Sequence, residues 1–229
     1  KLLIVADHAS NHIPKNYNNL GLTKKEILTH KAYDPGVGDL AINLSKKLNS
    51  QLVLGQYSRL LIDCNRDVDD PTLISVISDR KLILGNTKIT KQERVNRINK
   101  IYIPYHENIK KKILEKKINV IVSLHSFNPI FKGKKRFLKF GILSNQDRRL
   151  SNLIISELKK NKIIVGDNEP YKGSLIGDTL YKHALKSRVH HSLIEIRNDL
   201  LSNVKKIDQV SNLMYRVINN SIKRLPISS

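Results

Sequence analysis

Short runs of apolar and β-branched residues alternate with longer stretches of helical period along the whole chain. This alternation is typical of an α/β protein, in which helices cover a largely parallel sheet. The apolar runs predict strands at 2–5, 51–54, 59–62, 120–124, 138–143, 163–165 and 192–196. The periodic stretches predict helices at 37–48, 91–101, 105–117, 148–160, 179–185 and 207–223. We therefore expect a three-layer α/β fold, with a mostly parallel mixed sheet and helices on both faces.

The sequence predicts one domain over residues 1–229. It contains no internal repeat, low-complexity tract or Pro- and Gly-rich linker, and a chain of this length can bury a full core. A membrane-spanning helix needs about 18 consecutive apolar residues, and no apolar run in the sequence is that long. Residues 1–5 do not resemble a secretory signal. We expect a soluble, cytoplasmic protein. Cys64 is the only cysteine, which excludes an internal disulfide and a cysteine-based zinc cluster.

The formal net charge of +21 is a weak indication of nucleic-acid binding. The lysines are scattered over most of the predicted helices, and few aromatic residues lie among them to stack on bases. We expect solvated helix faces, a nucleic-acid partner being the less favoured alternative. A small anionic substrate would also be attracted by this charge.

Polar residues collect directly after the predicted strands. In a parallel sheet the carboxyl ends of the strands share one edge, where ligands bind. We therefore expect the functional site at this edge, built from Asp7 and His8, from Asp63, Asn65 and Arg66, from His125 and Ser126, and from Glu195 and Arg197.

His8 and His125 each follow a strand, and two imidazoles with one carboxylate would form the three-ligand site of a catalytic zinc. The alternative interpretation is that His8 and His125 are ordinary hydrogen-bonded residues of a loop or of the core. The third ligand is open between Asp34, in a Gly-rich loop before a helix, and Asn11, whose amide oxygen is a poor zinc ligand. Asp34 is the preferred candidate, and a helix cap or turn is its alternative role. The other histidines considered, His12, His30 and His106, are expected to be structural.

Glu195 lies within a strongly apolar strand, where a carboxylate is costly unless it is paired or functional. Beside a metal it could accept a proton from water and pass it to the leaving nitrogen. The alternative is an ion pair with Arg197, which strand alternation places on the same face.

Arg59, Asn65 and Arg66 form a polar cluster that suits a substrate carboxylate, because arginine presents a planar fork of donors. Salt bridges to Asp63, Asp67 or Asp69 are the alternative. Ser126 and Arg197, at the ends of their strands, are further candidates for substrate binding. Cys64 is expected to be a buried, inert thiol. The long stretch 67–85 beside these arginines is a candidate lid.

Seven blocks of residues, in order over nearly the whole chain, resemble the N-formylglutamate amidohydrolases, in particular the short bacterial members of that family. The blocks are Asp7 to Pro14, Asp34 with Gly36, Ser58 to Arg66, Pro104 with His106, Ser123 to Phe127, Asn168 to Tyr171, and Glu195 to Leu200.

The resemblance implies a three-layer fold similar to zinc carboxypeptidases and aspartoacylase. It implies one zinc ion per chain on His8 and His125, Glu195 as the general base, and Asn65 with Arg66 as the grip on a substrate carboxylate. Arg59 would hold the substrate or polarise its acyl oxygen. The implied reaction is hydrolysis of N-formyl-L-glutamate to formate and glutamate. The alternatives are a deacylase of another N-acyl amino acid or small peptide, and a metal-free protein that binds anionic ligands or nucleic acid.

Overall fold

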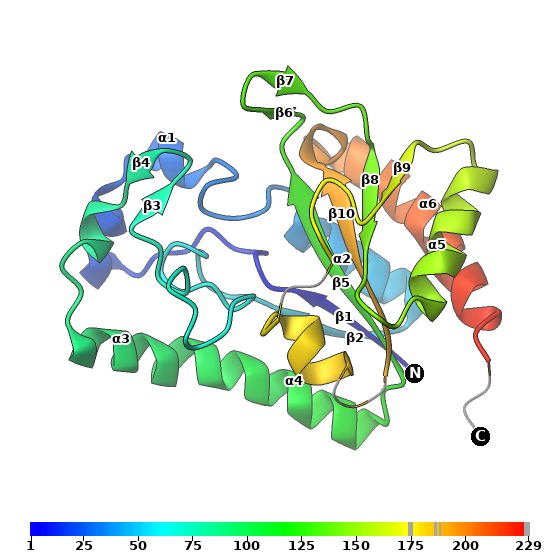
Figure 1. Ribbon diagram of the computed structural model, residues 1–229, viewed down its shortest axis with the longest axis horizontal. Coiled ribbons are helices and arrows are strands. Elements are labelled where there is room, and N and C mark those ends of the chain that lie inside the picture. The colour runs from blue at the N-terminus through cyan, green and yellow to red at the C-terminus, as the bar shows by residue number, and fades with distance from the viewer. Residues whose placement is uncertain (174–175, 186, 188, 227–229) are drawn as a thin grey trace.

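The computed structural model describes residues 1–173, 176–185, 187 and 189–226, and its centre is a six-stranded mixed sheet (Figure 1). The strand order is β2-β1-β5-β10-β8-β9. The first four of these strands are parallel, whereas β8 is antiparallel to β10 and parallel to β9. The strands are β1 (Leu2–Ala6), β2 (Gln51–Leu54), β5 (Val120–Phe127), β8 (Phe140–Leu143), β9 (Val165–Asp167) and β10 (His190–Arg197).

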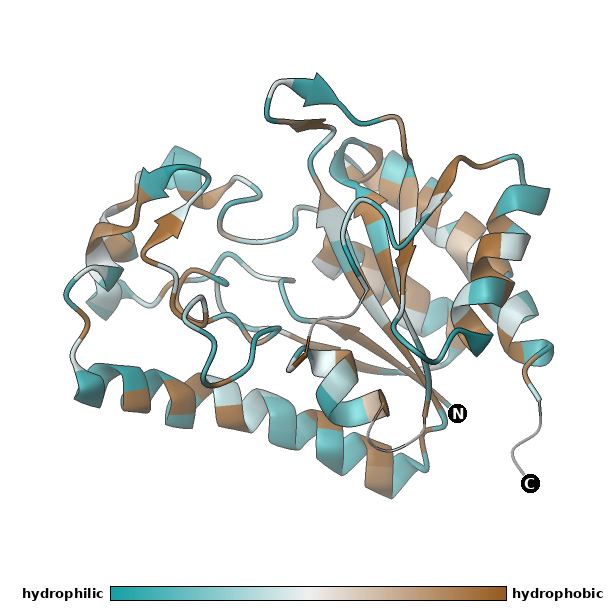
Figure 2. Cartoon of the chain, viewed as in Figure 1, coloured by the Kyte–Doolittle hydropathy of each residue, from teal (hydrophilic) through white to brown (hydrophobic). Residues whose placement is uncertain are grey.

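Helices cover both faces of the sheet, so the predicted three-layer α/β fold is confirmed. One face packs against α2 (Val37–Leu48), α5 (Arg149–Lys160) and α6 (Val204–Lys223). The other face packs against α4 (Ile103–Lys116) and the helical segment that ends in the π-helical turn η4 (Tyr181–Leu185). Every residue of β5 is buried, as expected for a strand covered on both sides. Figure 2 shows the strands largely apolar and the helices alternating between apolar and polar residues.

A third apolar cluster lies beside the sheet, and it explains a wrong strand prediction. Residues 59–62 were predicted as a strand, but Leu60, Leu61 and Ile62 form a turn instead. The amide of Leu61 donates to the carbonyl oxygen of Ser58 at 2.9 Å, and the hydroxyl of Ser58 donates to the carbonyl oxygen of Ala32. These buried leucines pack against the segment before α2 rather than extending the sheet.

The helix predictions at 91–101 and 105–117 describe one continuous helical rod. The rod consists of α3 (Lys91–Arg97), the π-helical turn η3 (Ile98–Tyr102) and α4. The rod continues through Pro104, which is the second residue of α4 and stands directly after the π-helical turn. The predicted strand at 163–165 is displaced by two residues to β9.

Several short elements were not predicted. They are the hairpins β3 (Ile77–Ser78) with β4 (Lys81–Leu82) and β6 (Ile130–Phe131) with β7 (Lys134–Lys135), helix α1 (Lys24–Ile27), and the turns η1 (Lys15–Gly21), η2 (Leu84–Asn86) and η5 (Asn198–Leu201). Among the described residues, no helix has the length and apolarity to cross a bilayer.

Gly36 fixes the path of the chain into α2. Its φ of +79° lies in the left-handed region, and a Cβ atom there would lie 2.6 Å from the carbonyl oxygen of Leu201. Glycine is the residue that meets both conditions without strain. The turn that it makes places Asp34, two residues earlier, against the end of β1, where the amide of Asp34 donates to the carbonyl oxygen of His8 at 2.9 Å.

Candidate active site

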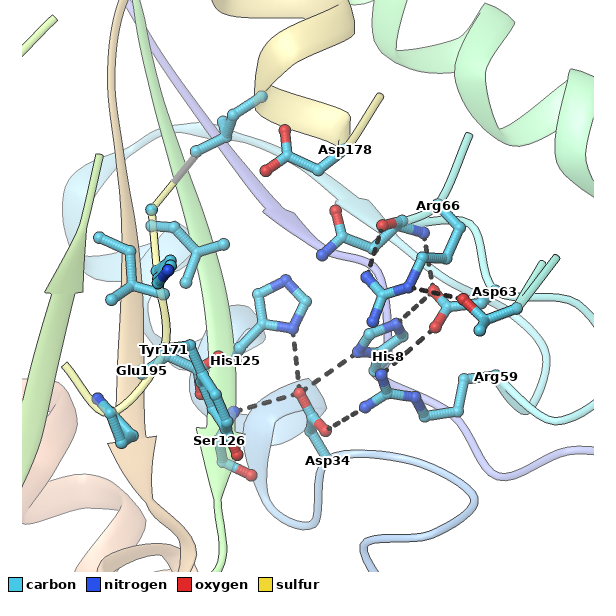
Figure 3. A pocket seen from close by; sticks show the side chains of 18 of the residues that line it. His8, Asp34, Arg59, Asp63, Arg66, His125, Ser126, Tyr171, Asp178 and Glu195 are labelled. Carbon is cyan, nitrogen blue, oxygen red and sulfur yellow. Dashed lines mark hydrogen bonds and ion pairs between the residues drawn. The ribbon is translucent and has the colours of Figure 1, made fainter. Parts of the chain in front are cut away.

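Three buried side chains from three segments converge at the carboxyl edge of the sheet (Figure 3). His8 follows β1, Asp34 precedes α2, and His125 lies in β5. One ligand atom from each of them lies within 4.8 Å of the other two. Oδ2 of Asp34 lies 3.6 Å from Nδ1 of His8 and 3.1 Å from Nδ1 of His125.

Each of the two histidines is held by a second carboxylate on its far ring nitrogen. Nε2 of His8 lies 2.7 Å from Oδ1 of Asp63, and Nε2 of His125 lies 3.1 Å from Oδ2 of Asp7. Metal-bound histidines in proteins have this arrangement, since the outer carboxylate fixes the ring and raises its basicity.

Asp7 is itself fixed from the opposite side of the sheet edge. The hydroxyl of Tyr105, on α4, donates to Oδ1 of Asp7 at 2.8 Å, and the hydroxyl of Thr179 donates to the same oxygen. The face of the sheet that α4 covers therefore anchors the outer partner of His125.

The electrostatics of the cluster favour charged groups despite complete burial. Burial disfavours the ionised form of Asp34, but its hydrogen bond with His125 and the nearby ring of His8 outweigh it and hold its pKa well below the ordinary value. Burial likewise opposes ionisation of Asp63 and Asp7, yet their histidine partners lower both pKa values. Burial disfavours protonation of His125, but its bonds with Asp34 and Asp7 raise its pKa well above the usual value.

The structure places Asp34, not Asn11, with the two histidines. The amide of Ser126 donates to Oδ2 of Asp34 at 3.1 Å, which holds the carboxylate toward His125. Asp34 makes no side-chain cap on α2, whose N-cap is Gly36. The side-chain amide of Asn11 donates instead to the carbonyl oxygen of Ile27.

These residues fit a divalent metal such as zinc. Nδ1 of His8 is buried and has no hydrogen-bond partner among the described residues, an expensive state for a polar atom unless a ligand meets it. Two imidazole nitrogens and one carboxylate are a donor set that catalytic zinc uses. His30, expected to be structural, also borders the site, with Nε2 3.3 Å from Oδ1 of Asp34.

Glu195 borders the same pocket from β10, where its backbone pairs with that of His125. Its side chain is buried, and Oε2 has no hydrogen-bond partner in the part of the chain that the structure describes. Burial raises the pKa of Glu195 to about 7. A buried carboxyl group with a pKa near neutrality is suited to accept and release a proton.

The pocket has a volume of about 700 Å³ and lies over the carboxyl ends of β1, β5 and β10. Arg59, Asn65, Arg66 and Ser126, four predicted contacts of a substrate, all line it. Arg59 forms ion pairs with Asp34 at 3.5 Å and Asp63 at 3.3 Å, so the salt-bridge alternative holds for this residue.

Arg66 is differently placed. Its guanidinium donates to the carbonyl oxygen of Asn65 and to the hydroxyl of Thr72, and it forms no ion pair within the described part of the chain. It can therefore receive a carboxylate. The hairpin β3–β4, inside the candidate lid 67–85, also borders the pocket through Ser78 and Asp79.

Arg197 lies outside the pocket. Its guanidinium donates to Asp199 at 2.7 Å and to the carbonyl oxygen of Arg136 at 2.9 Å. The ion pair with Glu195, considered from the sequence, is not formed, because Arg197 is already paired with Asp199. The structure gives Arg197 no contact with the site that would let it hold a substrate.

Sequence reasoning placed Asp7 and Asp63 at the site but did not identify them as partners of the histidines, and it gave no role to Tyr171, Asp178 or His191. Asp7 is adjacent to His8 and Asp63 follows a predicted strand, so an acid beside a candidate ligand was the available signal. Nothing in the local sequence indicates that Asp178 faces the pocket. Cys64 is buried next to the site, and burial raises the pKa of its thiol well above the ordinary value, consistent with an inert thiol.

The chain is similar to known proteins in sequence and in fold. The family model "N-formylglutamate amidohydrolase" matches residues 1–202. A gene product of Agrobacterium tumefaciens, Atu2144, is 33% identical, with a TM-score of 0.93 over 97% of this chain and 90% of that one. An N-formylglutamate amidohydrolase from Ralstonia eutropha JMP134 is 19% identical, with a TM-score of 0.74 over 97% and 93% of the two chains. A bacteriophage poly-gamma-glutamate hydrolase shares the fold at 12% identity and a TM-score of 0.52, over 97% of this chain and 85% of that one. No curated protein sequence matches the chain.

Proposed function

Because the chain belongs to the N-formylglutamate amidohydrolase family, whose reaction is amide hydrolysis, we propose that it is a zinc-dependent hydrolase of N-acyl amino acids and that N-formyl-L-glutamate is a substrate. The observation that carries the proposal is the convergence of His8, Asp34 and His125 beside Glu195.

In this proposal His8, Asp34 and His125 hold one zinc ion. When bound, zinc would act as a Lewis acid that polarises the substrate carbonyl and makes water more acidic. Asp63 and Asp7 keep the two imidazoles in the tautomer that directs Nδ1 at the ion, because their carboxylates accept a hydrogen bond from Nε2.

Glu195 moves the proton. Its unpartnered Oε2 accepts a proton from the attacking water and later donates it to the amide nitrogen as the C–N bond breaks. Its pKa of about 7 lets it perform both transfers near neutral pH.

Arg59, Arg66, Asn65 and Ser126 are proposed to orient the substrate. Arg66 is the residue best placed to take a carboxylate, since its guanidinium has no ion pair among the described residues. Arg59, close to Asp34, is placed to stabilise the negative charge that develops on the carbonyl oxygen. The unpartnered hydroxyl of Ser126 offers a further hydrogen bond.

A deacylase for a larger N-acyl amino acid is the second candidate. It is favoured by the cavity of about 700 Å³, which is within the range of pockets for drug-sized ligands and exceeds what N-formyl-L-glutamate fills.

The decisive test pairs metal analysis with activity. Purified protein is assayed for zinc content and for formate release from N-formyl-L-glutamate, before and after treatment with a chelator. One zinc per chain with chelator-sensitive formate release supports the proposal. Zinc without formate release directs the search to other N-acyl amino acids. Protein that binds no zinc when the metal is supplied contradicts the zinc assignment.

A further inference from the structure

The pocket continues from the proposed zinc site along strand β10. Glu195, Leu193 and His191 alternate along this strand and all line the pocket, so they share one face of it. Four residues of a strand span about 13 Å, and the pocket therefore reaches well beyond Glu195. Leu143, paired with Leu193, and Leu180 line its apolar middle part. We call the part bounded by Leu143, Leu180, Leu193, His191 and Asp178 the inner compartment.

His191 presents a hydrogen-bond acceptor in this compartment. Its side chain is buried, and Nδ1 lies 2.8 Å from the carbonyl oxygen of Val189. A carbonyl oxygen can only accept, so Nδ1 of the neutral ring carries the proton and Nε2 is left as an acceptor. That Nε2 atom is buried and has no hydrogen-bond partner among the described residues.

Asp178 adds a carboxylate that lacks a charged partner. Its side chain is buried, and Oδ1 accepts a hydrogen bond from the amide of Tyr181 at 2.7 Å. Within the described residues no lysine, arginine or histidine forms an ion pair with it, and the nearby Lys182 pairs with Asp67 instead. The other buried aspartates of the site have histidine partners and lowered pKa values, whereas burial raises the pKa of Asp178.

The inner compartment combines three apolar side chains with two acceptors, and it therefore complements an aliphatic arm that ends in a donor. A nitrogen-borne donor would satisfy Nε2 of His191, and a cation would also offset the charge of Asp178. N-formyl-L-glutamate has no N–H group other than its scissile amide, so it leaves these acceptors without a partner.

We propose that the inner compartment is a subsite for an ammonium, guanidinium or carboxamide group at the end of an aliphatic arm of the substrate. The inference rests on the proposed amide hydrolysis and narrows its substrates to N-acyl amino acids that carry such an arm. The arm is either the side chain of the amino acid or the acyl chain.

Two matched substrate series distinguish an arm on the amino acid from an arm on the acyl group. The first compares N-formyl-L-lysine with N-formyl-L-norleucine, and the second compares δ-aminovaleryl-L-glutamate with hexanoyl-L-glutamate and glutaryl-L-glutamate. We expect kcat/KM to favour the ammonium-ended member by about tenfold or more in at least one series, because a charge-assisted hydrogen bond is gained. The series that shows the preference identifies the arm.

Variants test whether the preference for an ammonium end arises from the inner compartment. Asp178→Asn keeps the acceptor for Tyr181 but removes the charge, and His191→Leu removes the Nε2 acceptor. We expect the ammonium-to-methyl ratio to fall toward one in both variants and to stay unchanged in Asp208→Asn, an exposed site on α6.

Hydrolysis without a preference for the ammonium end in either series overturns the subsite and leaves the proposed function intact. A preference that survives in both variants also overturns it. If none of the substrates is hydrolysed, the proposed function fails. The subsite is then tested by calorimetric titration of the wild type and Asp178→Asn with N-formyl-L-lysine and N-formyl-L-norleucine. Tighter binding of the lysine derivative that is lost in Asp178→Asn supports it, and equal binding refutes it.

Discussion

Nε2 of His8 lies 2.7 Å from Oδ1 of Asp63, and this bond directs the opposite ring nitrogen into the pocket. The same carboxylate pairs with Arg59 at 3.3 Å and accepts a hydrogen bond from the amide of Asn65 at 2.9 Å. Asp63 therefore connects a proposed metal ligand with two proposed substrate contacts.

We predict that Asp63→Asn weakens zinc binding by about 10–100-fold, the usual effect of losing a carboxylate partner of a ligating histidine. Competition with a chromophoric chelator measures the dissociation constant. Asp69→Asn, an exposed carboxylate in the same loop, is the control and should bind zinc like the wild type. Wild-type affinity in a folded Asp63→Asn protein would show that the charge of Asp63 does not support zinc binding by His8.

Glu195→Gln should retain zinc and lose about 10²–10⁴-fold in kcat, because glutamine cannot accept the proton. Metal analysis and single-turnover kinetics measure the two effects separately. Glu115→Gln on the exposed face of α4 provides a matched control. Turnover at the wild-type rate in Glu195→Gln would remove Glu195 from the mechanism.

The pH profile should report the ionisation of Glu195. Burial raises its pKa to about 7, and the base accepts a proton only when it is ionised, so kcat/KM should rise with pH and level off once Glu195 is deprotonated. A bound dication favours the ionised form, which places this limb at or below pH 7 in the zinc-loaded protein. The limb should vanish in the residual activity of Glu195→Gln, and an identical limb in that variant would assign it to another group.

Arg66→Lys should raise KM for N-formyl-L-glutamate by about tenfold with a smaller change in kcat, since lysine cannot reproduce a bidentate contact with a carboxylate. Steady-state kinetics give both constants. Arg80→Lys, at the exposed tip of the β3–β4 hairpin, should leave KM unchanged. If KM stays constant in Arg66→Lys, the carboxylate of the substrate is bound elsewhere.

Gly36→Ala should lower the free energy of unfolding by about 1–3 kcal/mol or more, because a left-handed residue and a close contact with Leu201 are combined at one position. Gly133→Ala has a similar φ of +78° but meets no atom within 4 Å, so it isolates the backbone contribution of about 1–2 kcal/mol. Urea denaturation measures both. Equal losses in the two variants would mean that the contact with Leu201 relaxes without cost.

The layers of the fold could be predicted from the sequence, because the strands and helices that build them carry strong hydrophobic periodicity. Helix α2 begins and ends at the predicted residues. The strand predicted at 59–62 failed for a tertiary reason, since Leu60 and Leu61 are as apolar as strand residues but fill a separate cluster beside the sheet. Local composition does not distinguish these two forms of burial.

The candidate site was predictable where its residues lie at the ends of strands. His8 and His125 were identified because each follows a predicted strand, and Glu195 because its carboxylate lies within an apolar one; the structure brings His8 and His125 together with Asp34. Asp178 could not be found in this way, because it reaches the pocket on a segment between strands. Arg197 shows the opposite error. It ends a strand at the carboxyl edge of the sheet, where the site lies, but its guanidinium pairs with Asp199 instead of entering the pocket.

The place of β10 in the sheet has a consequence for synthesis on the ribosome. It is the last strand of the sheet in the chain, yet it lies between β5 and β8, and β8 pairs with no other strand except β9. Until residues 190–197 leave the exit tunnel, no strand of the described sheet can join β2-β1-β5 to β8-β9. Glu195 arrives on the strand that joins them, so the sheet cannot be completed before the proposed base is in place.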